Sequence, residues 1–89
     1  MEIYFEATFE KDLKKIKDKK ALHPIRDIIE KVKKAAKPND IPGLKKMKGY
    51  ETFYRIRWGD YRLGFELDEK KVIFVRCLQR KDIYKYFPA

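Results

Sequence analysis

The sequence predicts an α+β fold, in which a helical hairpin packs on one face of a small antiparallel sheet. In the first half of the chain, apolar residues recur every three or four positions, which is typical of amphipathic helices. From Phe53 onward they alternate with polar residues, which is typical of half-buried strands. A chain of 89 residues can build one compact core and no second one, so residues 1–89 are expected to form a single domain.

The expected order of elements is strand, helix, helix and three strands, followed by a short C-terminal helix or tail. Met1 to Phe5 alternates like a short strand, and Thr8 stands where the N-cap of the first helix belongs. Pro24 suits the first turn of the second helix, and Pro38 ends that helix. The lysines of both segments occupy the solvent side of amphipathic helices, and the pattern requires no binding role of them.

A β-hairpin is expected in the second half of the chain. Two alternating segments, residues 53–58 and 61–67, flank the dipeptide Gly59-Asp60, which suits a two-residue turn. The length of the turn fixes the register, so that Arg57 faces Arg62 across the two strands.

A third strand is expected from Val72 to Leu78. If residues 68–70 form a three-residue loop, Arg62 pairs with Arg76. Cys77 then falls on the core face, where a thiol packs as a small apolar side chain and is not a nucleophile.

The charge balance indicates a polyanionic partner. Lysine and arginine total 23 against 14 acidic residues, and the resulting net charge of +9 attracts and steers nucleic acid. The single cysteine cannot form an internal disulfide, and the sequence shows neither a signal peptide nor an apolar run of about 20 residues. A cytoplasmic protein without a membrane role is therefore expected.

The arginines of the predicted sheet form a candidate binding surface. In the expected register Arg57, Arg62 and Arg76 lie side by side, about 5 Å apart, and Arg55 joins them. Like charges in such positions repel each other, so stability alone would favour a mixture with acids. Because the planar guanidinium matches phosphate oxygens, the row predicts a track for RNA phosphates in preference to an ordinary solvated face.

The C-terminal segment adds two candidates. Arg80 shares the strand parity of Arg76 and reaches the same face if the strand runs that far. A following turn brings Tyr84 back over this face, where its phenol either contacts a ribose or a base or packs the chain end onto the sheet. No cluster of cysteine, histidine or carboxylate surrounds His23 in the sequence, so a metal or proton-transfer role is not expected of it.

Two sequence segments resemble the RelE/ParE superfamily of bacterial and archaeal toxins. They are YRIRWGDYRL at residues 54–63 and QRKDIY at residues 79–84, and the resemblance extends to the whole chain. It implies the order of elements given above and, in the RelE branch, an mRNA interferase that cuts messenger RNA in the ribosomal A site. A cognate antitoxin protein neutralises such a toxin, and no metal or other cofactor is involved. The ParE branch of the same fold inhibits DNA gyrase instead.

The resemblance also implies roles for individual residues. Arg62 corresponds to the residue on the scissile phosphate, Arg80 to the one near the leaving 5′-oxygen, and Tyr84 to the one beside the ribose or a stacked base. Arg55 and Arg57 stand where RelE itself has lysines. These five are the candidate catalytic residues. Three further basic residues are candidates for RNA binding: Arg76, Lys81 and Lys48.

Cleavage of this metal-free kind begins when the 2′-hydroxyl attacks the neighbouring phosphate, while cationic groups stabilise the developing charge. Arginine suits that stabilising role but accepts a proton poorly, because the pKa of a guanidinium lies above about 12. The general base is therefore Lys81, Lys48 or Tyr84, or else ribosomal RNA contributes while the protein supplies position and charge. Three functions stay open: ribosome-dependent mRNA cleavage, gyrase inhibition, and RNA binding without catalysis.

Overall fold

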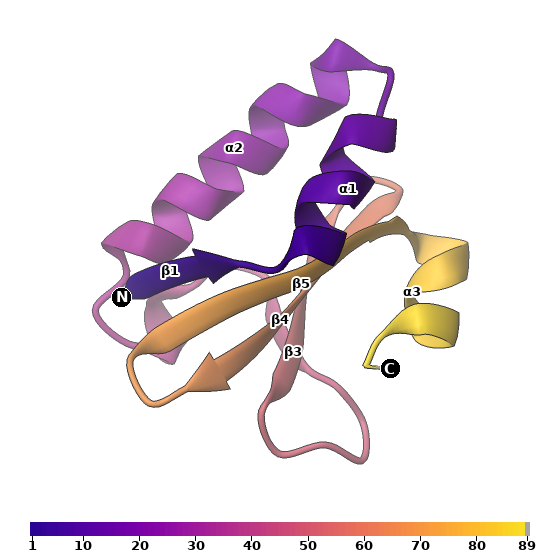
Figure 1. The fold of residues 1–89 in the computed structure, drawn as a ribbon. Helices are drawn as coiled ribbons and strands as arrows, with labels where there is room; N and C mark the ends of the chain where they lie inside the picture. The colour runs from indigo at the N-terminus through magenta and orange to yellow at the C-terminus, as the bar shows by residue number, and fades with distance from the viewer. Residues whose placement is uncertain (89) are drawn as a thin grey trace.

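The computed structural model describes residues 1–88 and shows an α+β fold, as predicted, with a five-stranded sheet in the order β1-β5-β4-β3-β2 (Figure 1). The elements are β1 (Glu2–Phe5), α1 (Ala7–Lys15), α2 (Lys19–Lys34), a 3-10 turn (Pro38–Asp40), β2 (Leu44–Lys46), β3 (Phe53–Trp58), β4 (Tyr61–Asp68), β5 (Lys71–Gln79) and α3 (Arg80–Tyr86). None of the helices formed within residues 1–88 combines the length and the apolar character needed to cross a membrane.

The sheet differs from the prediction at both of its edges. β1 runs parallel to β5, so the antiparallel arrangement expected for the whole sheet holds only from β2 to β5. β2 was not predicted, because three residues are too few to show an alternating pattern. It pairs with β3 and places Lys45 beside Arg55.

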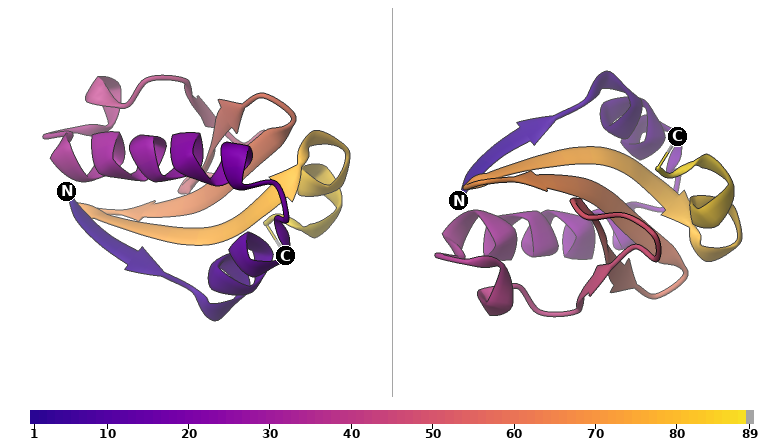
Figure 2. Two further views of the ribbon diagram at one scale, coloured as in Figure 1. Left: turned by 90° about the horizontal axis from the view of Figure 1, so that it is seen from above. Right: turned by 90° about the horizontal axis from the view of Figure 1, so that it is seen from below.

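The helix α2 covers one face of the sheet and closes the main core (Figure 2). It buries Ile25 and Val32 in a cluster with the inward side chains of β3, β4 and β5. The helix begins earlier than expected, at Lys19, because the carboxylate of Asp18 accepts a hydrogen bond from the Lys20 amide at 2.9 Å. The prediction that Pro24 opens this helix is therefore wrong, since Pro24 lies inside it.

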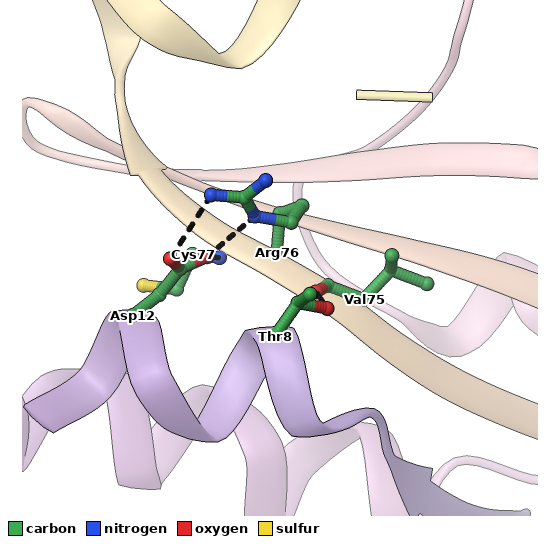
Figure 3. Close-up of polar contacts among 5 residues, drawn as sticks. All are labelled: Thr8, Asp12, Val75, Arg76 and Cys77. Carbon is green, nitrogen blue, oxygen red and sulfur yellow. Dashed lines mark hydrogen bonds and ion pairs between the residues drawn. The ribbon is translucent and has the colours of Figure 1, made fainter. Parts of the chain in front are cut away.

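The helix α1 follows the edge of β5 that β1 leaves uncovered. The pairing of β1 ends where Phe5 meets Phe74, and α1 continues along the next residues of β5. Thr8 does not cap the helix as predicted, because Glu6 is the N-cap. The Thr8 hydroxyl donates instead to the backbone oxygen of Val75 at 2.6 Å (Figure 3). This bond satisfies an edge carbonyl that no strand reaches.

The β3–β4 hairpin has the predicted register, with Arg57 opposite Arg62. The register of β5 is different from the prediction. The turn contains two residues instead of three, with Glu69 at a φ of 57°, and a bulge adds one residue to β5 opposite the junction of Gly64 and Phe65. Each change shifts the pairing by one position, so Arg76 stands opposite Gly64. The predicted pairing of Arg62 with Arg76 is wrong.

The second face of the sheet is partly covered by α3 and the chain that follows it. Met47, Ile83 and Phe87 form a small buried cluster there. The ring of Phe87 lies directly on Gly64, where a Cβ atom would come within 2.7 Å of the ring. Only glycine allows this approach, and the contact places α3 beside the arginines of β3 and β4.

Gly64→Ala tests this contact. The added methyl group forces the Phe87 ring to move, and overpacking of this kind costs about 1–3 kcal/mol of the free energy of unfolding. In a Phe87→Ala background the same substitution should cost little, because the ring is gone. Urea unfolding of the four proteins measures the coupling between the two sites. An equal cost of Gly64→Ala in both backgrounds would contradict the contact.

Candidate functional site

The five candidate catalytic residues line one cavity of about 260 Å³ on the second face of the sheet. We call it the arginine cavity. β3 and β4 supply three of the residues and α3 the other two, and the lining is Arg55, Arg57, Arg62, Arg80 and Tyr84. Four guanidinium groups therefore surround one hollow that no acidic side chain lines. Such a concave, cationic surface concentrates anions.

Arg62 is the most enclosed of these residues, with only 5% of its surface exposed. Its Nη1 donates to the backbone oxygens of Gly59 and Tyr61, at 2.8 and 2.9 Å, which ties the side chain to the hairpin turn. Within residues 1–88 its Nε and Nη2 donate to no protein atom. Two donors of a fixed guanidinium thus remain for a ligand, which is the geometry that binds phosphate well.

The electrostatic environment of Arg62 is unfavourable to its own charge. Burial lowers the pKa of its guanidinium, and the positive charges of Arg57, Arg55 and Arg80 lower it further. Because a guanidinium starts from a very high pKa, Arg62 still carries its charge at neutral pH. An anion in the cavity relieves this repulsion, so the site favours phosphate binding.

The helix α3 supplies Arg80 and Tyr84. The Arg80 amide donates to the backbone oxygen of Asp60 at 2.6 Å, which fixes the start of α3 against the hairpin turn. The sequence had suggested that Arg80 lies on an extension of the last strand. Arg80 instead reaches the arginine cavity from the first residue of α3. The Tyr84 ring is 62% exposed and lies 5.9 Å from the guanidinium of Arg55. Phe87 is the buried residue that packs the chain end onto the sheet, so Tyr84 is available to a ligand.

Arg76 does not belong to the arginine cavity. Its Nε and Nη2 donate to the carboxylate of Asp12 at 2.8 and 3.1 Å, and the same carboxylate accepts from the Cys77 amide at 2.9 Å (Figure 3). These bonds raise the pKa of Arg76. Its guanidinium also lies 5.8 Å from the ring of Tyr86. Arg76 thus joins α1, β5 and α3, and its charge is already neutralised.

The two lysine candidates lie at different distances from the site. Lys81 lines a neighbouring hollow together with Arg80 and Tyr84. Lys48 is an exposed residue of the turn between β2 and β3, and it is not among the residues that line the arginine cavity.

Sequence reasoning missed two residues of this region. Lys45 is beside Arg55 only because β2 exists, and that strand left no readable pattern. Asp12 did leave a signal, because Phe9, Asp12 and Ile16 follow one helical stripe. A carboxylate on an apolar stripe is buried and needs a partner, and Asp12 is 4% exposed with three hydrogen bonds.

The arrangement can bind a phosphodiester and stabilise negative charge on it. Guanidinium groups fixed before the reaction are most effective where charge develops in the transition state. Within residues 1–88, no three side chains of His, Cys, Asp and Glu gather where they could hold a metal ion.

The fold and the site together define a small basic α+β domain with a cationic, anion-binding cavity. A model of the family described as "ParE toxin of type II toxin-antitoxin system, parDE" matches residues 3–84. Toxin RelE3 of Methanocaldococcus jannaschii is 44% identical over 89 residues, which is 99% of this chain and 100% of that protein. The chain belongs to the RelE/ParE family of type II toxin-antitoxin toxins.

Solved structures agree with this assignment. The RelB-RelE antitoxin-toxin complex from Methanococcus jannaschii contains a chain that is 42% identical, with a TM-score of 0.80 over 96% of this chain and 99% of that one. The YoeB dimer from Staphylococcus aureus shares the fold at 21% identity, with a TM-score of 0.70 over 86% and 93% of the two chains.

Cys77 predicts a pH dependence of stability. Its thiol is 2% exposed, and burial together with the nearby charge of Asp12 raises its pKa from 9.0 to about 12. Between these values the unfolded chain loses a proton that the folded chain keeps, so the free energy of unfolding falls by up to about 1.4 kcal/mol per pH unit. Urea unfolding from pH 8 to 10.5 should show a steeper fall for the wild type than for Cys77→Ala. Parallel curves would contradict the burial of this thiol.

Proposed function

We propose that this chain is the toxin of a type II toxin-antitoxin pair and that it inhibits translation by ribosome-dependent endonucleolytic cleavage of mRNA. The observation that carries the proposal is the arginine cavity, in which four guanidinium groups and an exposed tyrosine surround one hollow. The 44% identity to Toxin RelE3 supports the RelE branch of the family.

The proposed reaction follows from the chemistry of RNA. The 2′-hydroxyl loses its proton to a base, its oxygen bonds to the adjacent phosphorus, and the bond from phosphorus to the 5′-oxygen breaks as that oxygen gains a proton. Arg62 is suited to the scissile phosphate, because its free Nε and Nη2 are oriented by the bonds of Nη1. Arg80 is suited to the leaving 5′-oxygen, while Arg55 and Arg57 add positive charge around the phosphate.

Two side chains of the protein are placed to act as the general base. The arginines of the cavity are poor proton acceptors, because they stay charged at neutral pH. Tyr84 lines the cavity and Lys81 lines the hollow beside it, so both are better placed than Lys48. Ribosomal RNA is the alternative source of a base, and it explains a requirement for the ribosome.

We also propose a cognate antitoxin as the protein partner. The related RelE of Methanococcus jannaschii is found in complex with RelB. A net charge of +9 suits an acidic or partly disordered segment that wraps the basic surface. Such a segment would block the arginine cavity or displace α3, which carries two of its five residues.

Gyrase inhibition is the second candidate function, and the match to the ParE family model favours it. A gyrase inhibitor of this fold would use its surface to bind a protein and would cut no RNA itself. The arginine cavity argues for the ribonuclease, because a protein-binding role does not require four guanidinium groups in one hollow.

Cell-free translation with primer extension on the mRNA tests the proposal. The wild type should stop translation and leave cuts at A-site codons. Arg62→Ala and Arg80→Ala should each reduce the cutting rate by about 100-fold, because each removes a donor to the charged transition state. Arg26→Ala is the matched control, since this exposed arginine lies on α2 and does not line the cavity.

Absence of A-site cuts from the wild type, or equal cutting by the wild type and both cavity variants, would contradict the ribonuclease proposal. A supercoiling assay with purified gyrase separates the second candidate. Inhibition of supercoiling by a chain that leaves translation intact would assign it to gyrase.

A further inference from the structure

Two further hollows lie around the junction of β5 and α3, next to the arginine cavity. The first, of about 530 Å³, shares Arg80 and Tyr84 with the arginine cavity. The second, of about 520 Å³, shares Gln79 with the first and lies between α1 and α3. We call it the α1–α3 hollow. The three hollows thus follow one another from the arginine cavity past Gln79 to Lys15 in the last turn of α1, and we call this row of hollows the groove.

The α1–α3 hollow has the chemistry of a nucleobase site. Tyr61 and Tyr86 contribute aromatic rings, and the Tyr86 ring is 52% exposed. Gln79 and Asp82 contribute an amide and a carboxylate, which can bond the edge of a base. Unpaired bases in RNA are recognised by this combination of stacking and edge contacts. The volume also suits a ligand of nucleotide size.

A cluster of lysines lies at the far end of the groove. Every lysine from position 11 to position 20 is exposed, and none of them forms an ion pair within residues 1–88. The two aspartates of this segment do not neutralise them. Asp12 is bonded to Arg76, and Asp18 accepts from the Lys20 amide. The lysine cluster consists of Lys11, Lys14, Lys15, Lys17, Lys19 and Lys20.

Lys15 connects the lysine cluster to the groove, because it lines the α1–α3 hollow itself. Lys11 lies one helical turn from Lys15 and Lys14 lies next to it, so α1 presents several ammonium groups near the hollow. Lysines so close together and without an acidic partner repel each other, and an RNA backbone that passes beside them releases counterions and gains affinity.

We infer that this groove is a track for single-stranded RNA, with a nucleobase in the α1–α3 hollow and backbone phosphates on the lysine cluster. The inference rests on the proposed function, since it extends the RNA beyond the nucleotides held in the arginine cavity. The track gives the toxin a second contact with the same RNA strand. That contact strengthens binding without touching the reacting phosphate.

Fluorescence anisotropy with a labelled single-stranded RNA of 12 nucleotides tests the track on the full chain at several KCl concentrations. A triple variant, Lys11→Gln with Lys14→Gln and Lys15→Gln, should bind on the order of tenfold more weakly. The slope of log K against log salt should fall by about two, because each phosphate contact on a single strand contributes about 0.7. An RNA of three nucleotides should bind both proteins equally, because it fills only the arginine cavity.

The matched control carries the same loss of charge around the C-terminal end of α2, as Lys31→Gln with Lys34→Gln and Lys37→Gln. Its affinity and salt slope should stay close to those of the wild type. Equal losses in the two triple variants would mean that only net charge matters, and the inference would fail. It would also fail if the α1 variant bound RNA normally and bound an acidic antitoxin more weakly, because the groove would then be a protein-docking surface.

The base site has a test of its own. Tyr86→Leu should weaken binding of the 12-nucleotide RNA by about tenfold through lost stacking, while Tyr86→Phe should keep the wild-type affinity. Tyr4→Leu, an exposed tyrosine on β1, is the control. Equal affinities for all four proteins would overturn the base site. The track and the proposed function can fail separately. If the α1 triple variant and Tyr86→Leu bind RNA like the wild type while Arg62→Ala still abolishes cutting, the track is refuted and the proposed function stands.

Discussion

The contact between Phe87 and Gly64 is the constraint on which the site depends. The helix α3 has seven residues, too few to be stable without tertiary packing. The Phe87 ring on Gly64, with Ile83 and Met47 around it, supplies that packing. Because α3 carries Arg80 and Tyr84, this apolar contact brings them to the arginines of the hairpin. The arginine cavity is therefore a product of tertiary structure and not of any single strand.

The arginines near the site differ in whether an acidic side chain pairs with them. Arg76 is neutralised by Asp12 and connects three elements, whereas the four arginines of the cavity have no acidic partner in its lining. Gathering four like charges costs free energy, and burial adds to that cost at Arg62. Proteins accept such unfavourable arrangements at functional sites when the remainder of the structure is stable enough. The main core beneath α2 meets that condition, since its aromatic and aliphatic residues are almost completely buried.

The sequence was most informative where local rules determine the structure. The Gly59-Asp60 turn sets the β3–β4 register, so the neighbouring positions of Arg57 and Arg62 could be predicted. The register of β5 could not, because a shorter turn and a bulge each move it by one residue without a sequence pattern that marks them. The predicted position of Arg76 opposite Arg62 was lost with that register. Strand parity and a following turn, together with the resemblance to a toxin family, made Arg80 and Tyr84 candidates. Their approach to the cavity on α3 could not be predicted, since no local rule places a helix against a sheet.

In the proposed function Arg55, Arg57, Arg62 and Arg80 act together on RNA phosphate. NMR spectra of the arginine Nε–Hε groups test it most directly, with a 2′-O-methylated trinucleotide that cannot react as the ligand. The resonances of these four arginines should shift together on titration. Arg76, held by Asp12, and Arg26, which lies on α2, should shift little. Larger shifts at Arg76 or Arg26 than in the cavity, or no response from the four, would contradict a shared phosphate site in the arginine cavity.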